Sequence, residues 1–317
     1  MTRKSQILKG MLFGAVSMVT GALLIQKTTK TPTLRTIPSF FSGQAPYLFS
    51  HRGGMGERPE STALAFDYSV QMQLTGFETD IRISKDEQVI VFHDAEVDRT
   101  TNGSGPVSAH TLDALKALDA GYHFKDINGD RPYQNHPDAK ILTMGELLSR
   151  YPEQLVNIDI KDHPDSYEGQ IAAQRLYDVI VQHEAKSRVL VTSFYREQIE
   201  RFHKISQGTV AIGASQAEVT EGILKLYSGL KHFYHGKAQT FQMPTHFHGI
   251  PLVQPKLIQW LNNTNRMPGY YDVNSVDLMH HLVSLGVHTI VTDRPSLVVS
   301  FSLPIANNSL NTVKWLG

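Results

Sequence analysis

The sequence predicts an α/β fold, a closed (β/α)8 TIM barrel with an N-terminal apolar helix and an insertion after the second strand. Short runs rich in β-branched and aromatic residues alternate with longer helical patterns from residue 47 onward. This order is typical of a parallel sheet covered by helices. Eight such runs over about 250 residues suit a closed barrel. A doubly wound open sheet has the same alternation and is the alternative.

The expected elements follow one another along the chain. The strands are predicted at residues 47–50, 77–83, 156–160, 189–193, 209–213, 239–243, 269–273 and 289–292. The helices are predicted at residues 61–74, 169–183, 196–205, 219–230, 256–262 and 276–285. A long connection between residues 95 and 142 is rich in Gly, Asn, Asp and Pro around a short helix, 111–118. Because long connections in compact domains are usually functional, we expect this one on the C-terminal face of the barrel, over the active site.

The first 30 residues combine a basic flank with an apolar run. Arg3, Lys4 and Lys9 precede or border residues 10–25, which carry no charge. A helix of that length reaches about 24 Å, slightly less than the hydrocarbon core of a bilayer. A basic flank before an apolar run is the export pattern. We therefore expect an export signal or membrane anchor, with a buried core helix as the alternative. Small residues near Ala22 offer a cleavage site, and cleavage stays open.

The predicted domain organisation follows from these segments. Residues 1–30 form the signal or anchor, 31–45 a linker, 46–300 the barrel and 301–317 a C-terminal tail. The linker is rich in Thr, Pro, Ser and Gly, which do not favour regular structure. The expected location is the periplasmic face of a bacterial inner membrane, or the periplasm if the segment is cleaved.

The composition excludes several classes of function. Lys+Arg and Asp+Glu both number 30, so the formal net charge is zero, which argues against a nucleic-acid partner. The chain has no cysteine, which excludes disulfides, thiolate metal sites and a cysteine nucleophile. It also lacks the GxxxxGK[ST] nucleotide loop and the GxSxG elbow of serine esterases.

Three carboxylates fall on the expected barrel strands. Glu78 and Asp80 are two residues apart, so both side chains point to the same face, which is the interior of a barrel. Neighbouring buried carboxylates repel each other unless a cation lies between them, which favours a hard divalent ion. Asp159, near the end of a later strand, could complete the oxygen ligands. The alternative is a polar layer with ion pairs to Lys161 or Arg82.

Two histidines follow apolar runs and are therefore expected at the mouth of the barrel. His51 follows residues 47–49, and His93 follows residues 89–92. Two imidazoles near a cation can divide proton acceptance and donation between them near neutral pH. The alternative is that each histidine merely ends a strand. Arg52 and Lys161 supply positive charge for a phosphate group.

Together these motifs resemble the glycerophosphodiester phosphodiesterase family, whose pattern reads HRG…PENT, ExD, HD…RTT. The matching segments are residues 51–53 (HRG), 59–62 (PEST), 78–80 (ETD), 93–94 (HD) and 99–101 (RTT). The resemblance continues through residues 157–161, 193–194, 241–244, 273–274 and 286–295, so it covers about residues 47 to 295 in order. Several independent motifs at consistent spacing make chance a poor explanation.

The resemblance implies metal-dependent hydrolysis of glycerophosphodiesters to glycerol 3-phosphate and an alcohol, by histidine acid/base catalysis with one Ca²⁺ or Mg²⁺. It assigns the metal ligands to Glu78, Asp80 and Asp159, the catalytic histidines to His51 and His93, phosphate binding to Arg52 and Lys161, and a metal-proximal place to Glu60. The chain departs from the family pattern at three places. Asp159 replaces a longer Glu, Ser61 replaces Asn, and Tyr271-Asp272 replaces Trp-Thr, which leaves the head-group preference in doubt.

Two other functions fit the same residues. One is lysophospholipase D-like cleavage of lysophospholipids, because an N-terminal anchor would hold the barrel near lipid. The other, of a different class, is a non-catalytic binding protein on the same barrel. The expected partners are a small phosphodiester or lysophospholipid, and the membrane through the N-terminal segment. The sequence leaves open the identity of the ion, the oligomeric state and which histidine is the acid.

Overall fold

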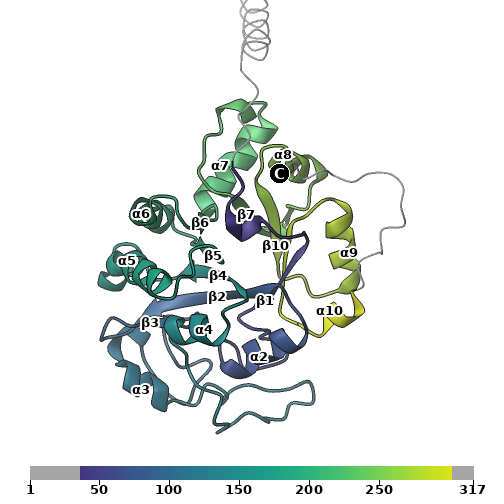
Figure 1. Ribbon diagram of the computed structural model, residues 1–317. Coiled ribbons are helices and arrows are strands. Elements are labelled where there is room, and N and C mark those ends of the chain that lie inside the picture. Colours follow the sequence, from purple (N-terminus) through teal and green to yellow (C-terminus); the bar gives the residue numbers. More distant parts are fainter. Residues whose placement is uncertain (1–35, 302–317) are drawn as a thin grey trace, which may run out of the picture.

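The computed structural model describes residues 36–301 and shows a closed barrel of parallel strands surrounded by helices (Figure 1). The strand order is β6-β5-β4-β2-β1-β11-β10-β7. The two end strands meet through a parallel bridge between Gly213 and Thr240, and Ala214 N donates to Thr240 O at 2.9 Å. The predicted (β/α)8 barrel is therefore confirmed, and the open sheet is wrong. The predicted N-terminal helix lies outside the described residues.

All eight predicted barrel strands are present. They are β1 (Tyr47–His51), β2 (Gly76–Ile83), β4 (Leu155–Ile160), β5 (Val189–Thr192), β6 (Ala211–Ile212), β7 (Thr240–Pro244), β10 (Met267–Tyr271) and β11 (Thr289–Thr292). β10 begins two residues earlier than predicted, and β6 is shorter than predicted. The sequence analysis missed the pairing of β3 (Val89–Val91), which runs antiparallel to β2 outside the barrel. It also missed the hairpin of β8 (His246–Phe247) and β9 (Ile250–Pro251).

Eight helices among the described residues cover the barrel. They are α2 (Ala63–Gln71), α4 (Met144–Arg150), α5 (Tyr167–Gln182), α6 (Arg196–Ser206), α7 (Gln216–Tyr227), α8 (Pro255–Asn262), α9 (Val276–Ser284) and α10 (Leu297–Ser300). Five of them, α2, α4, α5, α7 and α9, begin at side-chain caps. Thr62, Ser166, Ser215 and Ser275 each accept a hydrogen bond from the backbone N–H three residues later. Among residues 36–301, no helix combines the length and the apolar character needed to cross a membrane.

The N-terminal end of the barrel is closed by aromatic side chains. The short helix η1 (Ser39–Phe41) places Phe40 and Phe41 beneath the strands, with ring centroids 4.8 Å apart. Phe40 also packs against Tyr47 and Phe49 at the start of β1, at 6.4 and 6.1 Å. Because this end is filled with buried rings, the opposite end of the strands is left to form a pocket.

The long connection between β3 and α4 forms a small unit of its own. It contains η2 (Val107–Ala109) and α3 (Leu112–Ala117), and its core includes Val97, Leu115 and Ile141. Figure 1 shows α3 beside β3, at the outer edge of the molecule. No residue between 95 and 142 lines the pocket described below, so the expectation that this connection covers the active site is wrong. Its contact with the site is made by Arg99, which binds Glu60.

Candidate active site

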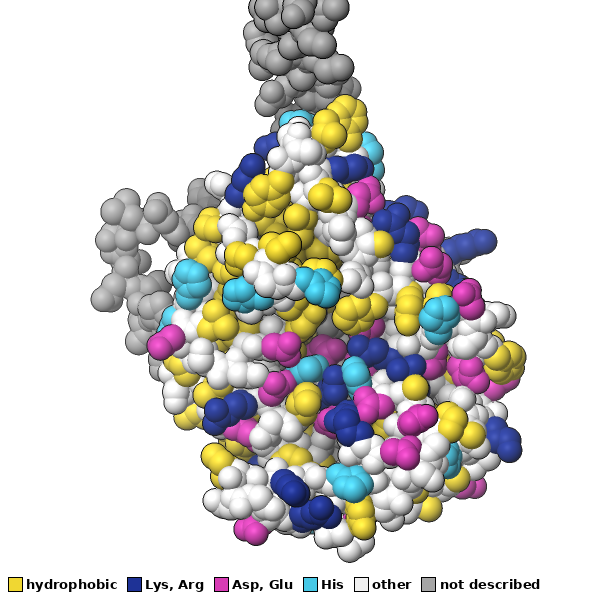
Figure 2. All heavy atoms as spheres, turned by 180° about the vertical axis from the view of Figure 1, so that it is seen from behind, with side chains coloured by type: hydrophobic (Ala, Val, Ile, Leu, Met, Phe, Trp, Pro, Cys, Tyr) yellow, Lys and Arg dark blue, Asp and Glu magenta, His cyan; other side chains and the backbone are white. Residues whose placement is uncertain are grey.

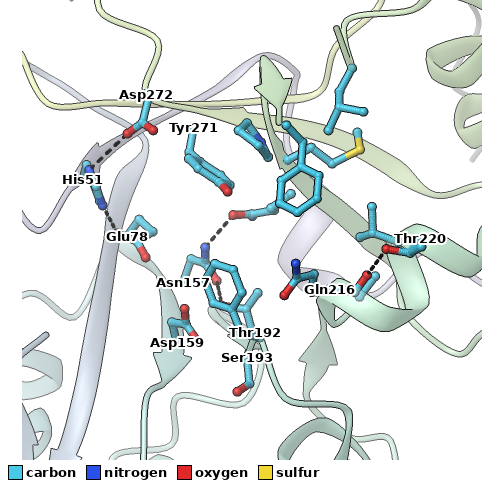
Figure 3. Close-up of a pocket in the computed structure, with 18 of the residues that line it drawn as sticks. His51, Glu78, Asn157, Asp159, Thr192, Ser193, Gln216, Thr220, Tyr271 and Asp272 are labelled. Atoms are coloured by element: carbon cyan, nitrogen blue, oxygen red, sulfur yellow. Dashed lines mark hydrogen bonds and ion pairs between the residues drawn. The ribbon is translucent and has the colours of Figure 1, made fainter. Parts of the chain in front are cut away.

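A cavity of about 590 Å³ opens at the C-terminal ends of the barrel strands. Six of the eight predicted site residues line it: His51, Arg52, Glu78, His93, Asp159 and Lys161. Figure 3 shows His51, Glu78 and Asp159 facing it from neighbouring strands. The floor continues across the barrel, where Asn157 Nδ2 donates to Gln242 Oε1 at 2.8 Å. Six of the predicted residues therefore share one cavity at the C-terminal end of the barrel, and their individual roles stay predictions.

The predicted acidic ligands lie on facing positions of β2 and β4. In the parallel register, Asp80 is opposite Asp159, and Glu78 is opposite Asn157. Lys161 Nζ contacts both aspartates, at 3.1 Å from Asp80 Oδ1 and 2.7 Å from Asp159 Oδ2. Arg52 Nε lies 3.2 Å from Asp80 Oδ2. The two cations therefore neutralise the aspartates in the ion-pair layer that the sequence analysis kept as its alternative.

Arg82, the other cation suggested for that layer, has different partners. Its Nη1 donates to Asp162 Oδ1 at 3.0 Å and to the carbonyl of Lys161 at 2.9 Å. Its Nε donates to the carbonyl of His93 at 3.0 Å. Arg82 therefore supports the backbone beneath the site and leaves the acidic residues to Lys161 and Arg52.

The carboxylates are not fully satisfied by these pairs. Among the described residues, Glu78 Oε2, Asp80 Oδ2 and Asp159 Oδ1 are buried without a hydrogen-bond partner. Burial and the neighbouring charge of Asp80 raise the pKa of Glu78 to about 7. Burial also raises the pKa of Asp159, whereas for Asp80 the charges of Lys161 and Arg52 outweigh burial and lower the pKa. Burying such oxygens is costly, so this cluster has unused capacity to bind a cation.

A different group of side chains has ligand atoms that are already close together. Within residues 36–301, His51, Asp272 and Asp293 are the three that offer atoms within 4.8 Å of one another. The metal-ligand roles of Glu78, Asp80 and Asp159 stay predictions.

His51 is held by a carboxylate from the opposite end of the domain sequence. Its Nδ1 lies 2.6 Å from Asp293 Oδ1, and Asn274 Nδ2 donates to Asp293 Oδ2 at 2.6 Å. The other ring nitrogen, Nε2, lies 3.7 Å from Glu78 Oε2. Burial alone would lower the pKa of His51, but the hydrogen bond to Asp293 and the charge of Glu78 raise it to about 9. His51 is therefore an imidazolium near neutral pH.

His93 has the opposite electrostatic character. Its Nδ1 lies 2.6 Å from Asp94 Oδ1, which orients the ring and leaves Nε2 for other contacts. Burial lowers the pKa of His93, so the ring is neutral near pH 7. Burial would raise the pKa of Asp94, but hydrogen bonds from Arg99 and His93 lower it to about 2, so Asp94 stays ionised. The site thus pairs a charged imidazole with a neutral one.

Glu60 contacts arginines. It accepts a hydrogen bond from Arg52 Nη1 at 3.1 Å and two from Arg99, at 2.8 and 2.7 Å. Arg99 also donates to Asp94. It therefore connects Glu60, which holds Arg52, with Asp94, which holds His93. The metal-proximal role predicted for Glu60 stays a prediction.

The sequence analysis assigned no role to Asp293, Asn274, Asp94 or Arg99. All four were recognised only as parts of the family motifs. The sequence did contain a signal for Asp293: it directly follows an apolar strand, β11, just as His51 ends the apolar strand β1. This position would have placed Asp293 at the mouth of the barrel. A hydrogen bond across 242 residues has no local pattern, and it becomes visible only when β1 and β11 pair.

Known proteins share both sequence and fold with this chain. A glycerophosphodiester phosphodiesterase of Bacillus subtilis (strain 168) is 28% identical over 260 residues, covering 78% of this chain and 83% of that protein. A solved glycerophosphoryl diester phosphodiesterase domain from Mycobacterium tuberculosis is 17% identical with a TM-score of 0.68, covering 80% of this chain and 97% of that one.

A second solved structure, a phosphodiesterase of Oleispira antarctica in complex with the product sn-glycerol-3-phosphate, is 22% identical with a TM-score of 0.64. It covers 81% of this chain and 96% of that chain. At these identities the solved structures show a common fold. A sequence model described as the glycerophosphoryl diester phosphodiesterase family matches residues 51–297, most of the chain, and the chain therefore belongs to this family.

Proposed function

We propose that this protein hydrolyses glycerophosphodiesters to glycerol 3-phosphate and an alcohol. The observation that carries the proposal is that His51 and His93 line one pocket with Arg52 and Lys161, each histidine held at Nδ1 by a carboxylate oxygen 2.6 Å away. Membership of the family supports the same reaction. A non-catalytic binding protein has no need for two imidazoles that carboxylates orient in one pocket.

A divalent cation fits the carboxylate cluster. Glu78, Asp80 and Asp159 each have a buried oxygen without a hydrogen-bond partner among the described residues, and hard cations prefer such oxygen ligands. Ca²⁺ or Mg²⁺ at these residues would neutralise charge on the phosphate oxygens as the P–O bond breaks. Asp159 is one methylene shorter than Glu, and its carboxylate is already paired with Lys161. A cation that binds Asp159 would have to displace this ion pair.

The protein's own residues bind and orient the diester. Arg52 and Lys161 face the cavity as the positive groups that a phosphodiester requires, Arg52 through paired N–H donors and Lys161 as a point charge. Glu60 keeps the guanidinium of Arg52 in place through the hydrogen bond at 3.1 Å.

Proton transfer is divided between the histidines. His93, neutral and oriented by Asp94, accepts the proton of the attacking hydroxyl through Nε2, whether water or a neighbouring hydroxyl of the substrate attacks. His51, charged and oriented by Asp293, donates its Nε2 proton to the departing alcohol. This assigns the base to His93 and the acid to His51.

The activity is tested by release of glycerol 3-phosphate from glycerophosphocholine with Ca²⁺ or Mg²⁺, and again after chelation. We expect release that depends on the cation and falls by at least about 100-fold in His51→Ala and in His93→Ala. His281→Ala, on the exposed side of α9, is the matched control and should keep full activity. Undiminished release in either site variant would exclude the proposed proton transfers.

We also propose that residues 1–30 direct export and anchor the barrel at the periplasmic face of a bacterial inner membrane. The support is the basic flank followed by the uncharged residues 10–25. A periplasm-active reporter fused after residue 45 should be active, and the fusion should stay in the membrane fraction after carbonate washing. Activity in the soluble periplasmic fraction would indicate cleavage, and an inactive reporter would contradict export.

A further inference from the structure

The catalytic pocket has a second arm with an apolar wall. Six of the residues that form it are Phe194, Val219, Ile223, Met243, Phe247 and Leu252. They come from the loop after β5, from α7, from β7 and from the hairpin β8–β9 with the residue that follows it. Figure 2 shows hydrophobic side chains gathered above the charged and histidine side chains on one face of the molecule. A bare glycerol moiety or a small polar head group would leave this wall in contact with water.

Phe194 joins the apolar arm to the charged centre. Its ring centroid lies 5.2 Å from Lys161 Nζ, and 51% of the residue is exposed. A phosphate held by Lys161 and Arg52 would therefore lie beside an aromatic ring, with the apolar arm directly beyond it. A chain attached to that phosphate would extend past Phe194 towards α7.

A helix face and backbone hydrogen bonds hold the residues of this apolar wall in place. Val219 and Ile223 are four residues apart, so they lie on one face of α7. Leu252 is anchored on both sides, because its N–H donates to Thr245 O at 2.9 Å and its carbonyl accepts from Tyr270 Oη at 2.8 Å. The apolar surface reaches the mouth of the pocket at Leu224, which is 65% exposed.

We propose that this arm binds the hydrocarbon chain of a glycerophosphodiester that still carries one acyl chain. Concave apolar surfaces of this size, with a few convergent polar groups at one end, fit a ligand that is largely apolar and charged at one end. The inference rests on the proposed function and names its substrate class. The balance of the reaction is unchanged: water supplies oxygen to phosphorus, the P–O bond to the alcohol breaks, and the alcohol leaves with a proton.

Chain length is the direct test. The full chain is assayed with lysophosphatidylcholines of six to fourteen acyl carbons below their critical micelle concentrations, and with glycerophosphocholine. Each methylene that enters the arm should raise kcat/KM by up to about fourfold, until the arm is filled and the values level off. Values that do not change with chain length, or that favour glycerophosphocholine, would overturn the inference.

Variants separate the arm from the chemistry. Ile223→Asn and Leu224→Gln should each lower, by at least tenfold, the ratio of kcat/KM for the dodecanoyl substrate to that for glycerophosphocholine. Because Leu224 is 65% exposed, the second variant is not expected to misfold. Val181→Gln, an exposed apolar residue on α5 outside the pocket, should leave both rates and the ratio unchanged.

The outcomes also distinguish this inference from the proposed function. Cleavage of glycerophosphocholine without any effect of chain length overturns the inference alone. Loss of both activities, or absence of cleavage with either ion, overturns the proposed function and the inference with it. An unchanged ratio in both arm variants also counts against the inference, whatever the absolute rates.

Discussion

His51 Nδ1 lies 2.6 Å from Asp293 Oδ1, so the residue that ends the first barrel strand is oriented by the residue that follows the last one. This contact exists only when β1 and β11 pair and the barrel is closed. It fixes the ring with Nε2 towards the pocket and favours its charged form. Four predictions follow: from this contact, from the contacts of Lys161 and of Arg99 described above, and from the burial of His288 against Phe41 and Tyr47.

Replacing Asp293 by Asn should lower kcat/KM by about 10²- to 10⁴-fold, because the ring loses its orientation and the preferred tautomer. The acid must be protonated, so activity is lost as the pH rises through its pKa. Loss of the carboxylate lowers the pKa of His51 from about 9, and the upper limb of the pH–rate profile should move towards neutral pH. Steady-state assays across pH 5 to 10 measure both effects.

Asp272 provides the matched control for that variant. Its Oδ1 is also near His51 Nδ1, but at 4.0 Å and on a side chain that is 58% exposed. Asp272→Asn should therefore lower kcat/KM by less than about fivefold. Equal losses in the two variants would show that general negative charge, and not the hydrogen bond, controls His51.

Replacing Lys161 by Met should have opposite effects on cation binding and on catalysis. Lys161 contacts both Asp80 and Asp159, so its loss leaves these buried carboxylates without their ion pairs. In the presence of a chelator this should lower the free energy of unfolding by about 3–5 kcal/mol. Adding Ca²⁺ or Mg²⁺ should raise the Tm of the variant by more than it raises the Tm of the wild type, and the ion should bind the variant more tightly. The kcat/KM should still fall at least 100-fold, because the phosphate loses a charged contact.

Calorimetric titration and thermal melts with and without the ion measure these effects of Lys161→Met. Lys116→Met, which breaks a surface pair with Glu146, is the control and should cost less than about 1 kcal/mol. Weaker cation binding in Lys161→Met would place the ion away from Asp80 and Asp159.

Arg99 should act as a positioning residue. It binds both Glu60 and Asp94, which in turn hold Arg52 and His93, and it does not line the pocket. Arg99→Ala should lower kcat about tenfold, and Arg99→Lys should recover little of it because an ammonium group cannot reproduce the paired N–H donors.

The lower limb of the pH–rate profile separates positioning by Arg99 from a loss of folding. It should shift in Arg99→Ala because the partner of His93 is less well held, whereas the Tm should stay within a few degrees of the wild type. Arg196→Ala, which breaks the surface pair of a similarly exposed arginine with Glu221, is the control and should leave the profile unchanged. A profile that does not move in Arg99→Ala would assign this arginine a structural role.

His288 should make stability depend on pH. It packs against Phe41 and Tyr47, and burial lowers its pKa from 6.5 to about 4. Protonation therefore favours the unfolded chain, and stability is complete above pH 6.5 and is lost as the pH falls towards 4. The free energy of unfolding should fall by about 3 kcal/mol across this range.

Denaturant titrations at pH 7, 5.5 and 4 measure that slope in the wild type and in His288→Gln, where it should be reduced by this amount. His281→Gln, on the exposed side of α9, is the control and should keep the slope of the wild type. An unchanged slope in His288→Gln would assign the acid sensitivity to other groups.

The sequence was most informative where one local rule decides the structure. Glu78 and Asp80 share a face because strand side chains alternate, and His51 lies at the mouth because it ends an apolar run. The start of α4 was also open to prediction, since Thr143 and Glu146 form a capping box. The pairing of β3 with β2 was not predicted, because a run of three apolar residues does not by itself indicate which strand it will pair with.

Features that depend on contacts between distant segments could not be predicted in this way. The apolar spacing of Val219 and Ile223 is the same for a helix face that packs on a core and for one that lines a pocket. Similarly, the sequence offered Lys161 and Arg82 as equal candidates for the ion-pair layer, because the choice between them depends on the register of β2 against β4.

The two-residue strand β6 has a consequence for how this barrel can change. The seam between β6 and β7 rests on few hydrogen bonds, and the apolar arm lies beside it. The charged residues lie on β1, β2 and β4, across the barrel from that seam. Substitutions in α7 or in the hairpin β8–β9 can therefore change which substrates bind without disturbing the residues proposed to carry out the reaction. In the proposed assignment, selectivity and chemistry occupy opposite arcs of one ring, and each can diverge while the other is conserved.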